Sequence, residues 1–372
     1  MLLFRKDFSA AHFIEIMRSM SKKPLSTCDE MEGPFPVRPG PYDPDPDAQD
    51  DLWFLPAPND DPGDPPPSEP FDPPLIDPAA WRDAQGVLAA ELAQVALRMG
   101  LLTARLGGAG AGLRQRLALQ EVADLSWWAG DRSGADRLSL WIGLHQGAAG
   151  TETLALARSA WAMRRLTGGA MPGEGGWIDG SAAFLGREKT ADVADLAQTM
   201  EGLVGLHPVV QAAVLFQTWR LLGKGPVNDL EAAVMAARHG ATMVPAATGA
   251  ALFMPIAMGG YAALVAQGTP EHRLAGWLTG VDLSLRAALS LCDRVMAWDA
   301  RARQALADLQ GSTPLRLLAC LARWPMITAP LAEAETRASR AAVQRNLSVL
   351  LERGLIREVT GQGRYRVWAA RV

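Results

Sequence analysis

Residues 339–354 read SRAAVQRNLSVLLERG, and this stretch decides the fold expected of the C-terminal part of the chain. Ser339 can accept a hydrogen bond from a backbone N–H of a first helical turn, and Gly354 can adopt the left-handed conformation that ends a helix. The apolar residues between them repeat at helical spacing: Val343, Leu347, Leu350 and Leu351. The pattern predicts an amphipathic helix over 339–353.

A β-hairpin is predicted after this helix, and two shorter helices are predicted before it. The strand-like runs 355–359 and 364–368 flank a Gly-Gln-Gly turn. On the other side, a helix that begins at Pro314 must end at Pro325, because proline cannot continue it, and a second helix covers about 329–336. Three helices followed by a two-stranded wing (355–369) form a winged helix-turn-helix domain. We predict this domain for residues 313–372.

The charge of residues 313–372 favours a nucleic-acid partner. They contain ten Arg and four Glu, a balance of +6, whereas the whole chain has a net charge of −4. A recognition helix presents donors to base edges while nearby cations neutralise phosphates. We therefore predict sequence-specific binding to double-stranded DNA through the recognition helix and wing. The predicted contact residues are Ser339, Arg340, Gln344, Arg345, Arg364 and Arg366.

Each predicted contact has a chemical reason. Arg340 falls in the first helical turn, where the helix dipole disfavours a cation, so its position suits a nearby phosphate. Arg345 suits guanine and Gln344 suits adenine. The wing residues Arg364 and Arg366 are predicted to touch the DNA backbone or minor groove. The alternatives are a basic surface without a ligand and a winged helix that binds protein.

Residues 79–310 are predicted to be an all-α body. Helical spacing recurs along them without β-alternation, and twenty basic side chains balance twenty acidic ones. The Gly-rich stretch 168–180 is interpreted as a loop. Residues 240–270 carry no charge, but Pro245 and Pro255 interrupt them, so a buried segment is predicted there and no membrane span.

Residues 1–78 are predicted to be a disordered, acidic, Pro-rich arm. Residues 24–78 hold seventeen of the 26 prolines and fourteen Asp/Glu against one Arg. Proline removes backbone donors and like charges oppose collapse. One apolar island, residues 52–55, either packs on the chain's own body or docks a partner.

The sequence offers no ligand set for a metal or cofactor. The three cysteines are widely separated, and the five histidines lack the spacing of a zinc helix. Low cysteine use favours a reduced, cytoplasmic compartment. We predict no metal and no cofactor, and the sequence identifies no small-molecule effector.

A homodimer is predicted from the long helical segment 270–309, which directly precedes the C-terminal domain. Its apolar repeat is longer than one short core helix needs: Leu274, Val281, Leu285, Leu289, Cys292 and Met296. Two DNA-binding modules on a two-fold axis reach useful affinity more easily than one. The alternative is that this repeat lies inside the body.

Three stretches carry a family resemblance: 118–130 (ALQEVADLSWWAG), 291–297 (LCDRVMA) and 360–368 (TGQGRYRVW). They resemble a family of alphaproteobacterial proteins, often plasmid-borne, that pair a helical domain of unknown function with a C-terminal helix-turn-helix DNA-binding domain. The resemblance runs from about residue 85 to the end and excludes the arm. It implies a transcriptional or replicon-associated regulator whose body serves dimerisation or sensing.

The body is also distantly similar to Fic proteins, which transfer AMP to hydroxyl side chains. Residues 207–214 (HPVVQAAV) look like the helix before the Fic active loop. That loop carries a histidine base in the family, whereas residues 222–229 read LGKGPVND here, and Ala129 replaces a regulatory residue before Gly130. We therefore expect a degenerate Fic-like body and no enzyme. The alternatives are a divergent AMP-transferring enzyme and a non-catalytic helical scaffold for protein interactions.

Overall fold

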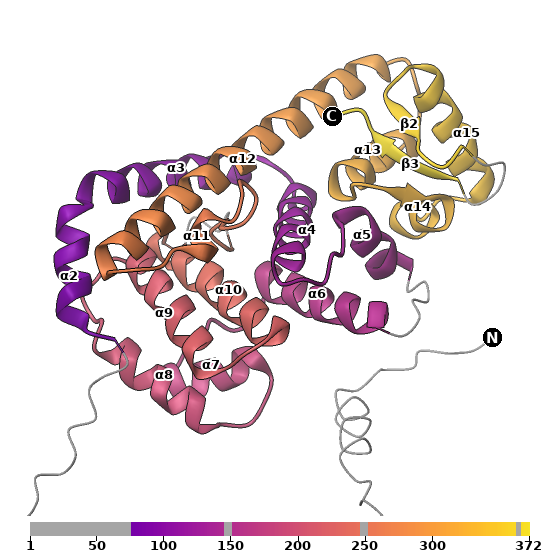
Figure 1. The fold of residues 1–372 in the computed structure, drawn as a ribbon. Coiled ribbons are helices and arrows are strands. Elements are labelled where there is room, and N and C mark those ends of the chain that lie inside the picture. Colours follow the sequence, from indigo (N-terminus) through magenta and orange to yellow (C-terminus); the bar gives the residue numbers. More distant parts are fainter. Residues whose placement is uncertain (1–75, 145–150, 246–251, 362–365) are drawn as a thin grey trace, which may run out of the picture. The chain divides into compact units, whose positions relative to one another are not determined.

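The computed structural model describes residues 76–144, 151–245, 252–361 and 366–372 (Figure 1). These residues are mainly helical, as the sequence predicts. The disordered arm expected at 1–78 lies almost wholly outside them. Within the described ranges, no single helix combines the length and apolar character needed to cross a bilayer, and one bent pair of helices, residues 78–87 with 89–108, meets those criteria by length and composition.

The described residues before 310 form a helical body. Its elements are α2 (Pro78–Val87), α3 (Ala89–Gly108), α4 (Ala111–Trp128), α5 (Ala135–Leu144), α6 (Thr151–Thr167), α7 (Trp177–Leu185), α8 (Ala191–Glu201), α9 (Pro208–Leu222), α10 (Pro226–Gly240), the 3₁₀ turn η1 (Ala241–Met243), α11 (Ala262–Val265) and α12 (Pro270–Ala305). Several of these helices begin with a capping side chain followed by proline. Asp77 accepts from the N–H of Ala79, and Thr269 accepts from that of His272. Proline at the next position removes one donor that the helix would leave unpaired.

Helix α7 corrects the prediction of a loop over 168–180. The Gly-rich stretch ends at Gly176, whose φ of 112° suits glycine, and Trp177 begins a helix. Gly180 lies inside that helix, where a Cβ would stand 2.6 Å from the carbonyl oxygen of Pro172. Here glycine permits a close approach between the helix and the preceding loop. The predicted loop is therefore confirmed for residues 168–176 and wrong for residues 177–180, which are helical.

The long helix α12 runs from the body to the C-terminal elements (Figure 1). It packs against α2, α3 and α11 along its first part and against α13 (Thr313–Arg323) near its end. Most of the apolar repeat offered above as a dimer surface is buried in these contacts: Leu274, Val281, Leu285 and Cys292 are fully buried and Leu289 is partly buried. The repeat up to Cys292 thus belongs to the core, whereas Met296 is 37% exposed, and the expectation of a dimer surface along the whole repeat is corrected. The homodimer itself stays a prediction.

A buried carboxylate organises part of the uncharged segment 240–270. Glu121 of α4 is fully buried, and its two oxygens accept from the backbone N–H groups of Ile256, Ala257 and Met258 at 2.8–3.3 Å. Burial raises the pKa of Glu121 to about 8, and the backbone donors oppose that rise. This contact holds the loop at residues 256–258 against α4. Helix α11 follows this loop in the chain.

The C-terminal part has the predicted order of helices, with one more strand. Its elements after α13 are β1 (Ile327–Thr328), α14 (Ala329–Thr336), α15 (Arg340–Glu352), β2 (Ile356–Glu358) and β3 (Val367–Ala370). The strands form an antiparallel sheet in the order β1-β3-β2, with Ile327 opposite Trp368 and Ile356 opposite Ala370. The additional strand, β1, lies in the connection between α13 and α14. Because β3 is the central strand, all four of its residues are buried.

Buried polar contacts join this part to the body. The Trp298 indole N–H of α12 donates to the carbonyl oxygen of Leu355 at 2.9 Å. Arg116 of α4, also buried, donates to the carbonyl oxygens of Leu321 and Trp324 at the end of α13. Helices α4 and α5 pack against α13 and α14. The C-terminal elements are thus fixed on the body by contacts on two sides.

Candidate nucleic-acid interface

Helix α15 is held by one apolar face. Val343, Leu347 and Leu350 are at most 1% exposed and face α13 and α14, which pack against α15. The hydroxyl of Ser339 accepts from the N–H of Ala342 at 3.3 Å and caps the helix. The predicted helix and its N-cap therefore lie where the sequence places them. Ser339 already has this structural role, so a DNA contact from it would be additional.

Three predicted contact residues lie in the N-terminal half of α15, outside its apolar stripe. Arg340 and Arg345 are exposed, and Gln344 is half-buried beside them. Among the residues that the structure describes, none of the three side chains has a hydrogen bond or ion pair. Ala341 and Ser348, both exposed, leave low relief around Arg345. This face presents guanidinium groups on a surface that can come close to another molecule.

Charge along α15 is distributed unevenly. Arg340 and Arg345 occupy its first two turns, whereas Glu352 is its last residue. A cation at a helix N-terminus is disfavoured by the helix dipole, and an acid at the C-terminus equally so. The arrangement opposes the dipole of α15 at both ends. An anion bound near the N-terminal half of the helix would explain why Arg340 and Arg345 lie there.

The turn between α14 and α15 contains a residue that sequence reasoning overlooked. Arg337 has φ = 52°, a left-handed conformation that costs a non-glycine residue about 1–2 kcal/mol. Its side chain is exposed and forms no ion pair with another residue of the described ranges. Arg337 therefore adds a third accessible guanidinium three residues before Arg340. The left-handed turn at Arg337 has no signal in the sequence, so sequence reasoning did not include this residue among the DNA contacts.

Neither of the two predicted wing residues, Arg364 and Arg366, is seen as a free side chain of the hairpin. Arg364 lies outside the described residues. The Nε of Arg366 donates to Glu358 at 2.8 Å, and its guanidinium lies 5.9 Å from the ring centre of Trp368. Arg366 is thus engaged within the hairpin. Arg357, on β2, is exposed and is the better candidate there.

Several other arginines that contribute to the +6 balance are also engaged internally. Arg353 forms a bidentate ion pair with Asp308 at 2.6 and 2.7 Å. Arg323 pairs with Glu335 at 3.0 Å, and Arg316 donates to the carbonyl oxygen of Thr336 at 3.1 Å. Net charge therefore overstated the accessible positive surface. Among the described residues of 313–372, the exposed arginines whose side chains have neither an ion pair nor a hydrogen bond are Arg337, Arg340, Arg345, Arg357 and Arg371.

Residues 222–229, compared above with the active loop of Fic proteins, form a tight connection between α9 and α10. Asn228 donates to the carbonyl oxygen of Trp219 at 3.0 Å, and Asp229 pairs with Arg220 at 2.6 Å. His207 caps α9, because its Nδ1 accepts from the N–H of Val209. Side chains that could have served nucleotide chemistry are thus engaged at the helix ends. In the described part of the chain, no group of three or more His, Cys, Asp or Glu side chains could hold a metal ion.

No protein-family model matches the chain, and no curated protein matches its sequence.

Proposed function

We propose that residues 313–372 form a winged helix-turn-helix domain that binds double-stranded DNA sequence-specifically. In this proposal the chain is a transcriptional or replicon-associated regulator, α15 is the recognition helix, and the β2–β3 hairpin is the wing. The observation that carries the proposal is the exposed N-terminal half of α15, where Arg340 and Arg345 have no partner among the described residues.

The packing of α15 supports this assignment. Its buried stripe fixes it on α13 and α14, so the exposed face has a defined orientation. A helix that reads bases must be positioned in this way, with the side chains of its first turns directed at the major groove. Arg345 suits the O6 and N7 of guanine, and Gln344 suits adenine.

The surrounding cations have a separate role. Arg337 in the turn and Arg357 on β2 lie on either side of α15 in the sequence, and both are exposed. Contacts from such residues to phosphates give affinity and orientation without reading sequence. The resemblance of residues 118–130, 291–297 and 360–368 to a family with a C-terminal helix-turn-helix domain points in the same direction.

The test is a fluorescence-anisotropy titration of the full chain with a labelled random-sequence duplex at several salt concentrations. We expect nonspecific binding whose log K falls linearly with log salt, with a slope of about −3 to −4 if four arginines contact phosphates. The variant Arg340→Ala should reduce the slope by about one. The matched control is Arg353→Ala, because that guanidinium is paired with Asp308. No binding at low salt would refute the proposal.

A further inference from the structure

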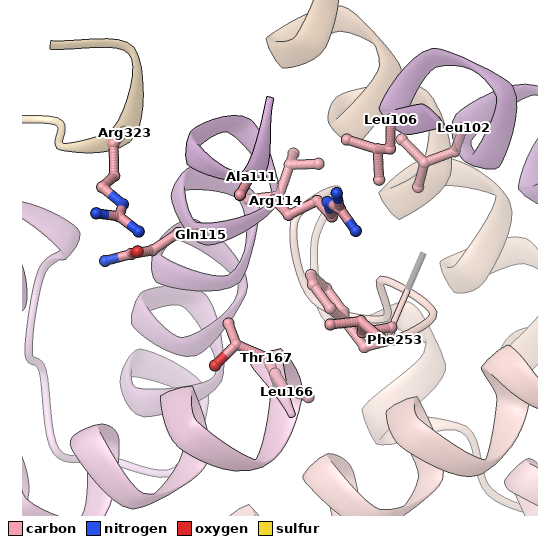
Figure 2. Close-up of a pocket in the computed structure, with 11 residues that line it drawn as sticks. Leu102, Leu106, Ala111, Arg114, Gln115, Leu166, Thr167, Phe253 and Arg323 are labelled. Carbon is pink, nitrogen blue, oxygen red and sulfur yellow. The ribbon is translucent and has the colours of Figure 1, made fainter. Parts of the chain in front are cut away.

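One cavity lies where the body meets the C-terminal part (Figure 2). It measures about 350 Å³ and is lined from α3, α4, α6, residues 252–253 and the last residue of α13. This volume falls within the range of sites for small organic molecules. Because Arg323 belongs to α13, the cavity includes a side chain of the proposed DNA-binding domain.

The lining combines an apolar wall with cationic groups. The wall comes from Leu102, Leu106, Leu117, Leu166, Leu252 and Phe253. The polar lining residues are Arg114, Gln115, Thr167 and Arg323, and the lining contains no acidic residue. Figure 2 shows Arg114 directed to the side of Leu102, Leu106 and Phe253, with Gln115 and Arg323 facing each other. Donors without carboxylates favour an anionic ligand.

Arg323 provides the most specific evidence. Its Nη1 donates to Glu335, whereas its Nε is buried and has no hydrogen-bond partner in the described part of the chain. Because protein atoms cover this Nε, the Nη2 group is the part of the guanidinium that a ligand in the cavity can contact. A hydrogen bond from this cationic Nη2 to a carboxylate oxygen is charge-assisted and stronger than one between neutral groups.

We propose that this cavity binds a small organic carboxylate with an apolar body, and that the bound ligand strengthens DNA binding. The carboxylate contacts Arg323 and Gln115, and the apolar body packs against the wall of Leu102, Leu106 and Phe253. Because the ligand connects α4 with α13, it stabilises the arrangement in which α15 is held on the body. The second half of this proposal rests on the proposed function, whereas the first half does not.

The binding test is calorimetric titration of the full chain with 4-phenylbutyrate and octanoate. We expect a Kd of about 0.1–1 mM for at least one of them, as suits ligands of this size. The uncharged 4-phenyl-1-butanol should bind at least about tenfold more weakly, because charge-assisted hydrogen bonds are lost. If neither carboxylate binds, or if the alcohol binds equally well, the cavity assignment is wrong.

Three variants locate the site. Arg323→Gln should weaken carboxylate binding at least about tenfold. Ala111→Trp should abolish it by filling the cavity, and the fold should tolerate this change because Ala111 is exposed at the start of α4. The matched control is Arg105→Gln, on α3 but outside the lining. Binding that survives Ala111→Trp would overturn the proposal.

The regulatory half is tested by repeating the DNA titration with saturating carboxylate. We expect the affinity for DNA to rise at least about fivefold in the wild type and to stay unchanged in Ala111→Trp. An unchanged affinity in the wild type would refute regulation. If the carboxylate binds but the chain binds no DNA with or without it, the proposed function fails while the carboxylate site stands.

Discussion

The Nη1 of Arg116 lies 2.9 Å from the carbonyl oxygen of Leu321, and the two residues are 205 positions apart in the chain. A second hydrogen bond from the same nitrogen reaches the carbonyl oxygen of Trp324 at 3.3 Å. Arg116 is buried, and burial lowers its pKa to about 10. A helix leaves its last carbonyl groups unpaired, and a cation there is also favoured by the dipole. One side chain of the body thus completes the end of α13.

We expect Arg116→Met to lower the free energy of unfolding by about 2–3 kcal/mol, because buried carbonyl groups lose a charged donor. Chemical denaturation followed by circular dichroism measures this change. The matched control is Arg137→Met, which removes an exposed ion pair with Glu152 and should have little effect. Equal effects of the two substitutions would show that the Arg116 contact contributes no more than a surface pair.

At pH 9, where the carboxyl of Glu121 is ionised, Glu121→Gln should destabilise the chain by about 2–4 kcal/mol, because an amide N–H₂ would then face backbone donors inside the core. Both carboxyl oxygens of Glu121 accept from N–H groups of residues 256–258, so neither orientation of the amide fits. The comparison is Asp124→Asn, where the side chain is half-buried and accepts from Gln120. A loss no larger for Glu121→Gln than for Asp124→Asn would contradict the account.

Acid should destabilise the chain partly through His239. Burial lowers the pKa of His239 from 6.5 to about 4, and its Nε2 lies 2.8 Å from the amide oxygen of Gln211. Between these pH values the unfolded chain binds a proton that the folded chain does not, so the free energy of unfolding falls as pH falls from 6.5 to 4. The full effect is about 3 kcal/mol.

The measurement for His239 is the free energy of unfolding at several pH values, in the wild type and in His239→Gln. The variant should lose this part of the pH dependence, whatever its stability at pH 7. Glu121 contributes the opposite sign over part of the range and is present in both chains, so the difference between them isolates His239. Parallel pH profiles would show that His239 does not titrate in this way.

Arg337→Gly should raise the free energy of unfolding by about 0.5–1 kcal/mol, because glycine adopts the left-handed conformation without strain. The same substitution should weaken DNA binding by removing a phosphate contact. Arg337→Ala separates these effects, since it keeps the strain and also loses the charge. We expect no gain in stability for Arg337→Ala and the same loss of DNA affinity. A stability gain shared by both variants would contradict the role of φ.

The sequence predicts α15 well because local signals determine it. Ser339 caps the helix and Gly354 follows it with φ = 70°, and both signals act over a few residues. The predicted strand 355–359 contains β2, whereas β3 ends at Ala370, two residues beyond the predicted end at 368, because β3 is the central strand of its sheet. Its apolar run depends on pairing with β1, which lies far away in the sequence.

Long-range contacts explain what the sequence did not predict. Nothing near Arg366 or Arg353 shows that one pairs with Glu358 and the other with Asp308. The α12 repeat appeared too long for a core helix because the helices that cover it come from distant segments. The cavity likewise depends on the contact between α4 and α13. Composition counts charges, whereas the fold decides which of them remain accessible.

The measurement that tests the central claim most directly is selection of bound duplexes from a random DNA pool, performed in parallel with the wild type, Arg345→Ala and Arg357→Ala. Each selected pool is sequenced. We predict that the wild type enriches one motif containing a guanine whose preference Arg345→Ala loses, at a cost of about 1–3 kcal/mol on that motif. Arg357→Ala should enrich the same motif with lower affinity. No enriched motif with the wild type, or an unchanged motif with Arg345→Ala, would contradict the claim that α15 reads DNA sequence.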